Sequence, residues 1–142
     1  MSLDIVLDFS QPMPIQSCMW LIFNEELGYA GTFDALYWYE HPKDKTKSGL
    51  VIMDYKTNAD LCKEFSRNTK KMLLPPFDYL YDEAKSYYIL QLSLYQKAIE
   101  HLGYPIIARR LIWLKDDGKY ELVPIENLSK ELTNALKKQN NE

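Results

Sequence analysis

Hydrophobic and polar residues alternate over the first 57 positions in a pattern that predicts three strands. Runs of strand length occupy residues 17–23, 31–39 and 49–57. Gly28 and the polar loop 41–48 separate these runs, so two consecutive hairpins are expected. Because side chains alternate along a strand, Phe33 and Ala35 should share one face of the second strand and Asp34 should lie on the other.

The second half of the chain predicts a long helix, a hairpin and a terminal helix. Hydrophobic residues at helical spacing occupy 82–102, with Asp82 as the expected cap and Gly103 as the stop. The remaining expected elements are a hairpin of strands 106–114 and 120–123, an amphipathic helix at 126–138 and a polar, weaker helix at 59–71. This order indicates an α/β (α+β) fold in a single domain over residues 1–142.

Composition narrows the class of protein. The 142 residues are 46% hydrophobic and 26% charged, which is typical of a globular domain. The longest apolar run, at 18–23, is far shorter than the roughly 20 residues that cross a bilayer, so a cytoplasmic protein with no membrane partner is expected. A net charge of −3 neither favours nor excludes nucleic acid. Two cysteines cannot supply a four-cysteine zinc or iron–sulfur site.

The second predicted hairpin brings two acidic residues together. Residues 34 and 54 are equally distant from position 44 in the loop, so a symmetric hairpin pairs Asp34 with Asp54, with Cβ atoms about 5 Å apart. Lys56 shares a strand face with Asp54. Two adjacent carboxylates on a mainly apolar face repel each other, so we expect a cation between them. Their oxygen ligands suit Mg²⁺ or Mn²⁺ better than zinc.

This grouping would suit phosphodiester hydrolysis. A metal at Asp34 and Asp54 would polarise a phosphoryl oxygen, and Lys56 would position or help to deprotonate the attacking water. An aspartate two residues before a lysine also occurs on many exposed strands that have no catalytic role, so the spacing alone leaves both interpretations open.

Gln91 and Tyr95 are the candidate polar groups on the long predicted helix. They belong to a stripe that faces the sheet and comprises Ala84, Tyr88, Gln91, Tyr95, Ala98 and Leu102. A buried amide needs hydrogen-bond partners. Either Gln91 satisfies a core backbone group and Tyr95 is ordinary packing, or both line the metal site or contact nucleic acid.

Three segments together resemble a known superfamily. They are Gly31-Thr32-Phe33-Asp34, Ile52-Met53-Asp54-Tyr55-Lys56-Thr57 and Gln91-Leu92-Ser93-Leu94-Tyr95. In order and spacing they resemble the PD-(D/E)XK nucleases, in particular the RecB-like branch that includes phage lambda-type exonucleases. The resemblance covers about residues 17–115 and is more specific than any one of its parts.

The resemblance implies a restriction-endonuclease-like core, with a mixed central sheet flanked by helices, and Mg²⁺- or Mn²⁺-dependent cleavage of DNA, with an exonuclease as the favoured type. Asp34, Asp54 and the backbone carbonyl of Tyr55 would be metal ligands, and Lys56 the catalytic lysine. The substrate-binding residues would be Gln91 and Tyr95, which match the Q-x-x-x-Y signature, and Thr57 in a supporting role.

The chain departs from the RecB-like pattern in three ways. The first helix that carries a further metal ligand in that branch is not evident before residue 17, which leaves three alternatives open: a fragment, a shortened member of the family, or a ligand supplied by an additional domain or subunit. The strand before Asp34 has Cys18, Met19 and Trp20 where many relatives have an acidic residue, while Glu25 and Glu26 fall in the predicted turn. The iron–sulfur cluster of some members is excluded by the cysteine count.

Two other functions stay open. One is a nuclease fold that has lost activity and binds DNA or a partner protein, which the absent first-helix ligand favours. The other is an unrelated enzyme that uses paired carboxylates as acid and base, such as a glycosidase.

Overall fold

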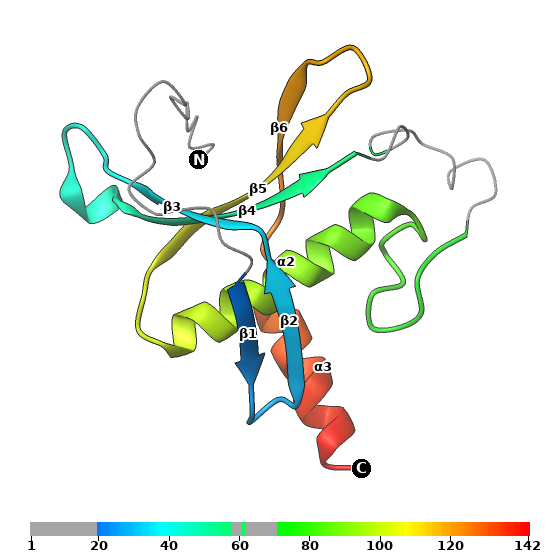
Figure 1. Cartoon of the computed structure of the whole chain (residues 1–142). Helices are drawn as coiled ribbons and strands as arrows, with labels where there is room; N and C mark the ends of the chain where they lie inside the picture. Colours follow the sequence, from blue (N-terminus) through cyan, green and yellow to red (C-terminus); the bar gives the residue numbers. More distant parts are fainter. Residues whose placement is uncertain (1–19, 58–60, 62–70) are drawn as a thin grey trace.

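The structure is a computed structural model that describes residues 20–57, 61 and 71–142 (Figure 1). Most of the polar helix expected at 59–71, both cysteines and the segment before Trp20 lie outside these residues. Within the described ranges, the expected α+β class is confirmed: a four-stranded mixed sheet and a two-stranded antiparallel sheet lie beside two helices. No helix in these ranges is long and apolar enough to cross a bilayer.

The two-stranded sheet is the first predicted hairpin. Strands β1 (Trp20–Asn24) and β2 (Tyr29–Phe33) pair antiparallel. Gly28 closes the turn with a φ of +73°, a left-handed conformation that glycine adopts without steric cost. Asn24 fixes the same turn, since its side-chain oxygen accepts the N–H of Leu27 at 2.9 Å. Glu25 and Glu26 lie in this turn, as predicted.

The four-stranded sheet runs in the order β3-β4-β5-β6. Its strands are β3 (Ala35–Tyr39), β4 (Gly49–Lys56), β5 (Ile106–Leu114) and β6 (Tyr120–Pro124). Strands β4 and β5 are parallel, and the outer pairs are antiparallel. Between β3 and β4, the expected loop holds a short 3₁₀ helix, η1 (Lys45–Lys47). The predicted hairpin register is confirmed, because Ala35 pairs with Met53 and Tyr39 with Gly49.

The prediction of a single strand over residues 31–39 is wrong. Asp34 forms a bend that separates β2 from β3, and the two strands belong to different sheets. The bend interrupts the alternation of side chains, so Phe33 and Ala35 do not share a face: Phe33 packs in the core on the side of the helices, and Ala35 packs in the cluster on the opposite side of the four-stranded sheet.

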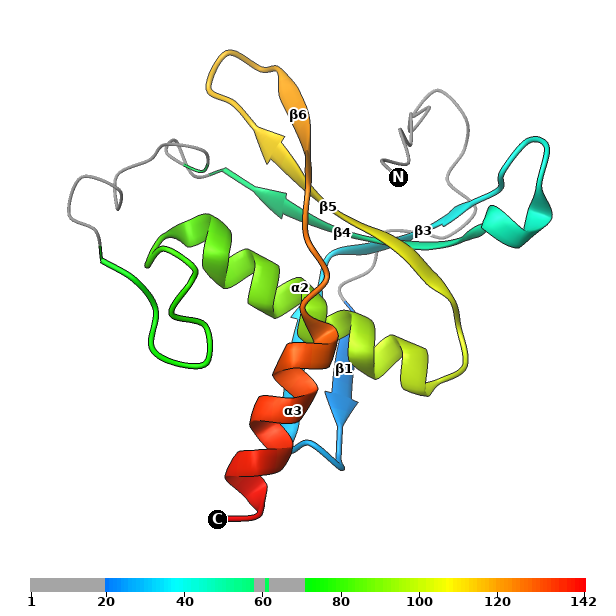
Figure 2. The same ribbon diagram turned by 180° about the vertical axis from the view of Figure 1, so that it is seen from behind.

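Both helices lie on one side of the four-stranded sheet (Figures 1 and 2). Helix α2 (Ala84–His101) crosses beneath the sheet, and α3 (Ser129–Asn140) packs on α2. Ile52, Leu92 and Leu111 are completely buried between α2 and the sheet. This core fixes the distance between α2 and β4, which carry the candidate site residues.

Two expectations about α2 are wrong. Its N-cap is Glu83, not Asp82, whose carboxylate instead accepts the Tyr87 hydroxyl at 2.5 Å and pairs with Lys71 at 2.6 Å. The second wrong expectation is that Leu102 belongs to the stripe that faces the sheet. Leu102 is 68% exposed, because the helix ends at His101 and the chain then turns away through Gly103.

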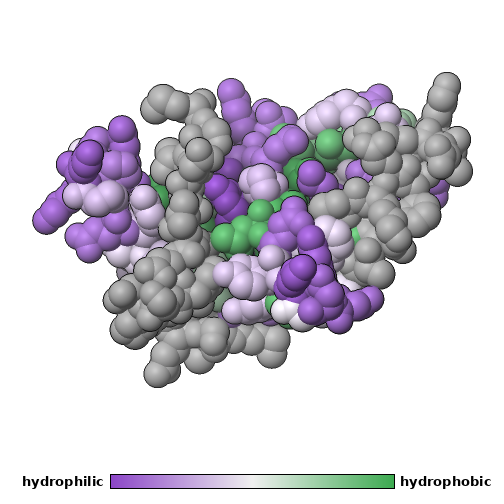
Figure 3. All heavy atoms as spheres, turned by 90° about the horizontal axis from the view of Figure 1, so that it is seen from above, coloured by the Kyte–Doolittle hydropathy of each residue, from purple (hydrophilic) through white to green (hydrophobic). Residues whose placement is uncertain are grey.

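The sheet face turned away from the helices has its own apolar cluster. Ala35, Val51, Met53, Ala108 and Ile112 are buried there. Figure 3 looks onto the molecule from this side and shows hydrophobic side chains in the middle with hydrophilic ones next to and around them. Strand β4 is therefore buried on both faces, which suits the central position of a parallel pair.

Gly31 allows β2 to approach α2 closely. A Cβ atom at this position would lie 2.6 Å from Cε1 of Tyr95 and 3.0 Å from its hydroxyl oxygen. The rings of Phe33 and Tyr95 are also in contact, with centroids 6.0 Å apart. The absence of a side chain at residue 31 thus lets Tyr95 pack directly against the backbone of β2.

We therefore expect Gly31→Ala to lower the free energy of unfolding by about 1–3 kcal/mol, the usual cost of overpacking. Denaturant unfolding monitored by circular dichroism measures this change. The control is Ala30→Ser, an exposed change at the adjacent position of the same strand. Equal stability of Gly31→Ala and the wild-type chain would show that Tyr95 does not depend on this close approach.

Candidate metal site

The bend at Asp34 brings a carboxylate to the end of β4. Oδ2 of Asp34 accepts the backbone N–H of Tyr55 at 2.9 Å. Strand β3 begins only at Ala35, so the Asp34 side chain takes the place that a paired strand residue would fill beside Tyr55. The prediction that Asp34 and Asp54 lie side by side is confirmed, because their carboxyl groups are within hydrogen-bonding reach. Asp34 reaches β4 from the bend, however, and not from within β3.

Asp54 and Lys56 form an ion pair on the helix-facing side of β4. Nζ of Lys56 lies 2.6 Å from Oδ2 of Asp54. The Asp54 residue is only 4% exposed, and the Lys56 side chain is 18% exposed. The prediction that these two residues share a strand face is confirmed. Both are held in place because the preceding residues Val51, Ile52 and Met53 are completely buried.

The pKa of Asp54 is raised to about 6, first by burial and then by the adjacent Asp34 carboxyl, while the Lys56 ammonium acts in the opposite direction. Two carboxyl groups within hydrogen-bonding reach cannot both ionise cheaply in a poorly solvated position. A divalent cation at this position would relieve the repulsion more completely than one lysine does.

The backbone adds a third oxygen to the same place. The N–H and C=O groups of one strand residue point to the same side of the strand, and the N–H of Tyr55 points toward Asp34. Its carbonyl therefore faces the Asp34 side, beyond the start of β3. The Tyr55 residue is partly exposed, at 39%, so solvent reaches this end of the strand.

These donors fit a hard cation. Carboxylate and carbonyl oxygens with several waters are the usual environment of Mg²⁺ and Mn²⁺, which keep part of their hydration shell. Among the residues that the structure describes, no group of three or more His, Cys, Asp or Glu side chains could hold a metal ion. At this position the side-chain ligands would be the two carboxylates of Asp34 and Asp54.

Gln91 and Tyr95 lie next to this group. Nε2 of Gln91 donates to the Tyr95 hydroxyl at 2.8 Å, and the backbone of Thr32 also hydrogen-bonds that hydroxyl. Burial raises the pKa of Tyr95, with a contribution from the Asp54 charge. The Gln91 amide, which is half-buried, therefore has a partner, and the pair links α2 to β2 beside the carboxylates. Thr57 is exposed immediately after β4.

Tyr88 also lies next to the site. The sequence analysis placed Tyr88 on the stripe of the helix that faces the sheet but assigned it no function. Nζ of Lys56 lies 4.2 Å from the centroid of the Tyr88 ring. The available signal was its position three residues before Gln91, which puts both side chains on one helix face.

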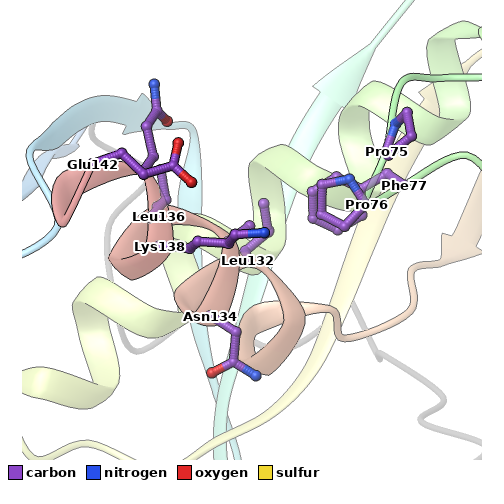
Figure 4. A pocket seen from close by; sticks show the side chains of 10 residues that line it. Pro75, Pro76, Phe77, Leu132, Asn134, Leu136, Lys138 and Glu142 are labelled. Carbon is purple, nitrogen blue, oxygen red and sulfur yellow. The ribbon is translucent and has the colours of Figure 1, made fainter.

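The lysines considered as phosphate contacts and the groove described below lie apart from these residues. Lys43, Lys45 and Lys47 belong to the β3–β4 connection, at the opposite end of the hairpin from Asp34. Lys71 pairs with Asp82, and the other basic candidates, Lys63, Arg67 and Lys70, lie outside the described residues. A groove of about 680 Å³ runs between residues 75–77 and α3 (Figure 4), and none of the candidate site residues lines it.

Comparisons of this chain with protein-family models, curated proteins and solved structures find no match.

The raised pKa of Asp54 makes the fold less stable as the pH rises. The folded chain holds this proton up to about pH 6, whereas an ordinary aspartate loses it near 3.8, so stability falls between these values. We expect Asp54→Asn, which stays neutral, to be more stable than wild type at pH 7 by up to about 3 kcal/mol. The difference should vanish below about pH 4.

Urea unfolding of both proteins between pH 3.5 and 8 measures this difference. Asp116→Asn, which removes an exposed carboxylate in the β5–β6 turn, controls for the loss of one surface charge. A difference between Asp54→Asn and wild type that is independent of pH would contradict the electrostatic explanation.

Proposed function

We propose that the chain is a Mg²⁺- or Mn²⁺-dependent nuclease that hydrolyses phosphodiester bonds of DNA. The observation that carries the proposal is the proximity of Asp34, Asp54 and Lys56 at one end of β4. Lys56 and Asp54 form an ion pair of 2.6 Å, and the Asp34 carboxylate accepts the N–H of Tyr55. The resemblance of the same residues to the PD-(D/E)XK motif adds support. Exonuclease action is the favoured form.

Each group has a role that its chemistry suits. Asp34, Asp54 and the Tyr55 carbonyl would hold the ion, which supplies positive charge beside the phosphoryl oxygens when bound. Lys56 would orient the attacking water and offset the negative charge that develops on the phosphate. Gln91 and Tyr95 would fix the position of β2 beside the site and contact the substrate, with Thr57 at the exposed end of the strand.

A second candidate is a nuclease fold that binds DNA or a partner protein without cleaving it. The observation that favours it is the small ligand set, because the described residues offer only two carboxylates at the site. For this second candidate, cleavage would require an additional domain or subunit that completes the metal shell. The glycosidase interpretation is less well supported, since catalytic carboxyl groups of glycosidases are about 5 Å or more apart. Those of Asp34 and Asp54 lie within hydrogen-bonding reach.

We expect the purified chain to cleave labelled DNA in Mn²⁺ or Mg²⁺, and Lys56→Ala to lower the rate at least about 100-fold while metal binding is nearly unchanged. The matched control is Lys130→Ala, an exposed lysine of α3.

Calorimetric titration should show weaker uptake of Mn²⁺ by Asp54→Asn and by Asp34→Asn, because each removes one charged ligand.

The assay uses single- and double-stranded DNA labelled at either end, so that the product lengths separate exonuclease from endonuclease action. Binding of the same DNA is followed by fluorescence anisotropy. Binding without cleavage in any divalent ion would support the inactive module. Equal Mn²⁺ uptake by wild type and Asp54→Asn would exclude the proposed metal site.

A further inference from the structure

Lys56 is held by two partners of different chemistry that come from different elements. Asp54, on the same strand, provides a carboxylate at 2.6 Å, and Tyr88, on α2, presents its ring at 4.2 Å from the ammonium nitrogen. The lysine side chain is mostly buried, so the attraction between cation and ring is not fully screened by water.

These two partners respond differently to a metal ion. In the nuclease proposed above, on which this inference rests, Asp54 is a metal ligand. Once its oxygen is engaged in that way, it is less available to the Lys56 ammonium. The face of an aromatic ring attracts a cation through its quadrupole and is not an oxygen ligand for Mg²⁺. The contact with Tyr88 therefore does not compete with metal binding.

We propose that Tyr88 is a positioning residue, which keeps the Lys56 ammonium at the reacting phosphate when Asp54 is engaged with the metal. Its place on α2 suits this role. Tyr88, Gln91 and Tyr95 lie on one stripe of the helix, so the same rigid element that contacts β2 through Tyr95 presents the ring to Lys56. The ring orients the lysine and does not itself touch the reacting atoms.

Two substitutions separate the ring from the rest of the side chain. Tyr88→Phe keeps the aromatic face, and its kcat should stay within about threefold of wild type. Tyr88→Leu keeps an apolar group but removes the ring, and its kcat should fall about ten-fold with KM for DNA unchanged. Tyr87→Leu, on the adjacent and exposed tyrosine, is the matched control and should cleave as wild type does.

A second measurement follows the lysine directly and needs no turnover. In ¹H–¹³C spectra of lysine-labelled protein, the ε-methylene resonance of Lys56, assigned from Lys56→Ala, should carry an upfield ring-current shift. This shift should persist when Mg²⁺ saturates the wild-type chain and in Tyr88→Phe, and should disappear in Tyr88→Leu. Thermal melting of each variant separates loss of positioning from loss of folding.

Four outcomes test the role of Tyr88 and separate it from the proposed nuclease activity. Retained kcat in Tyr88→Leu, or loss of the Lys56 shift on addition of Mg²⁺, would overturn the role of Tyr88. Absence of Mg²⁺ binding would also overturn it, because the role concerns the metal-bound protein. If wild type binds Mg²⁺ and keeps the shift but does not cleave DNA, the proposed nuclease activity fails while the positioning of Lys56 by Tyr88 stands.

Discussion

A carboxylate that is almost excluded from water, at the end of a strand buried on both faces, is the constraint around which this structure is organised. Asp54 cannot turn out into solvent, because β4 is paired with β5 at this residue and with β3 at the residue before it. Its charge must be offset where it lies, and Lys56 does so only in part, since the pKa of Asp54 stays raised. Such an arrangement costs stability and is typical of functional sites.

The second carboxylate depends on a break in regular structure. Had β2 continued without interruption into β3, Asp34 would be one more strand residue with alternating neighbours. The bend lets the chain pass from one sheet to the other and turns the Asp34 side chain toward the N–H of Tyr55. The same hydrogen bond joins the start of β3 to the end of β4, so the bend also limits how far these strands can separate.

Helix α2 sets the remaining geometry and is itself fixed by polar contacts on its other side. The hydroxyl of Ser93 accepts the N–H of Leu128 at 2.9 Å, before α3 begins. The buried amide of Gln96 bonds to the Arg109 guanidinium, whose Nε donates to the Ile125 carbonyl at 3.1 Å. These contacts tie α2 to β5 and to the segment after β6. The stripe with Tyr88, Gln91 and Tyr95 is thereby held against β2 and β4.

The sequence by itself determined the hairpin register, the shared face of Asp54 and Lys56, and the approximate positions of the strands apart from the one expected at 31–39. These follow from local alternation and from the symmetry of a loop around residue 44. The sequence could not determine the break at Asp34, since a bend that moves a chain between sheets depends on partners distant in sequence. Nor could it show that Tyr88 meets Lys56 or that Gly31 gives room to Tyr95. Those contacts join residues 32 and 64 positions apart, and only the packing of α2 against both sheets decides them.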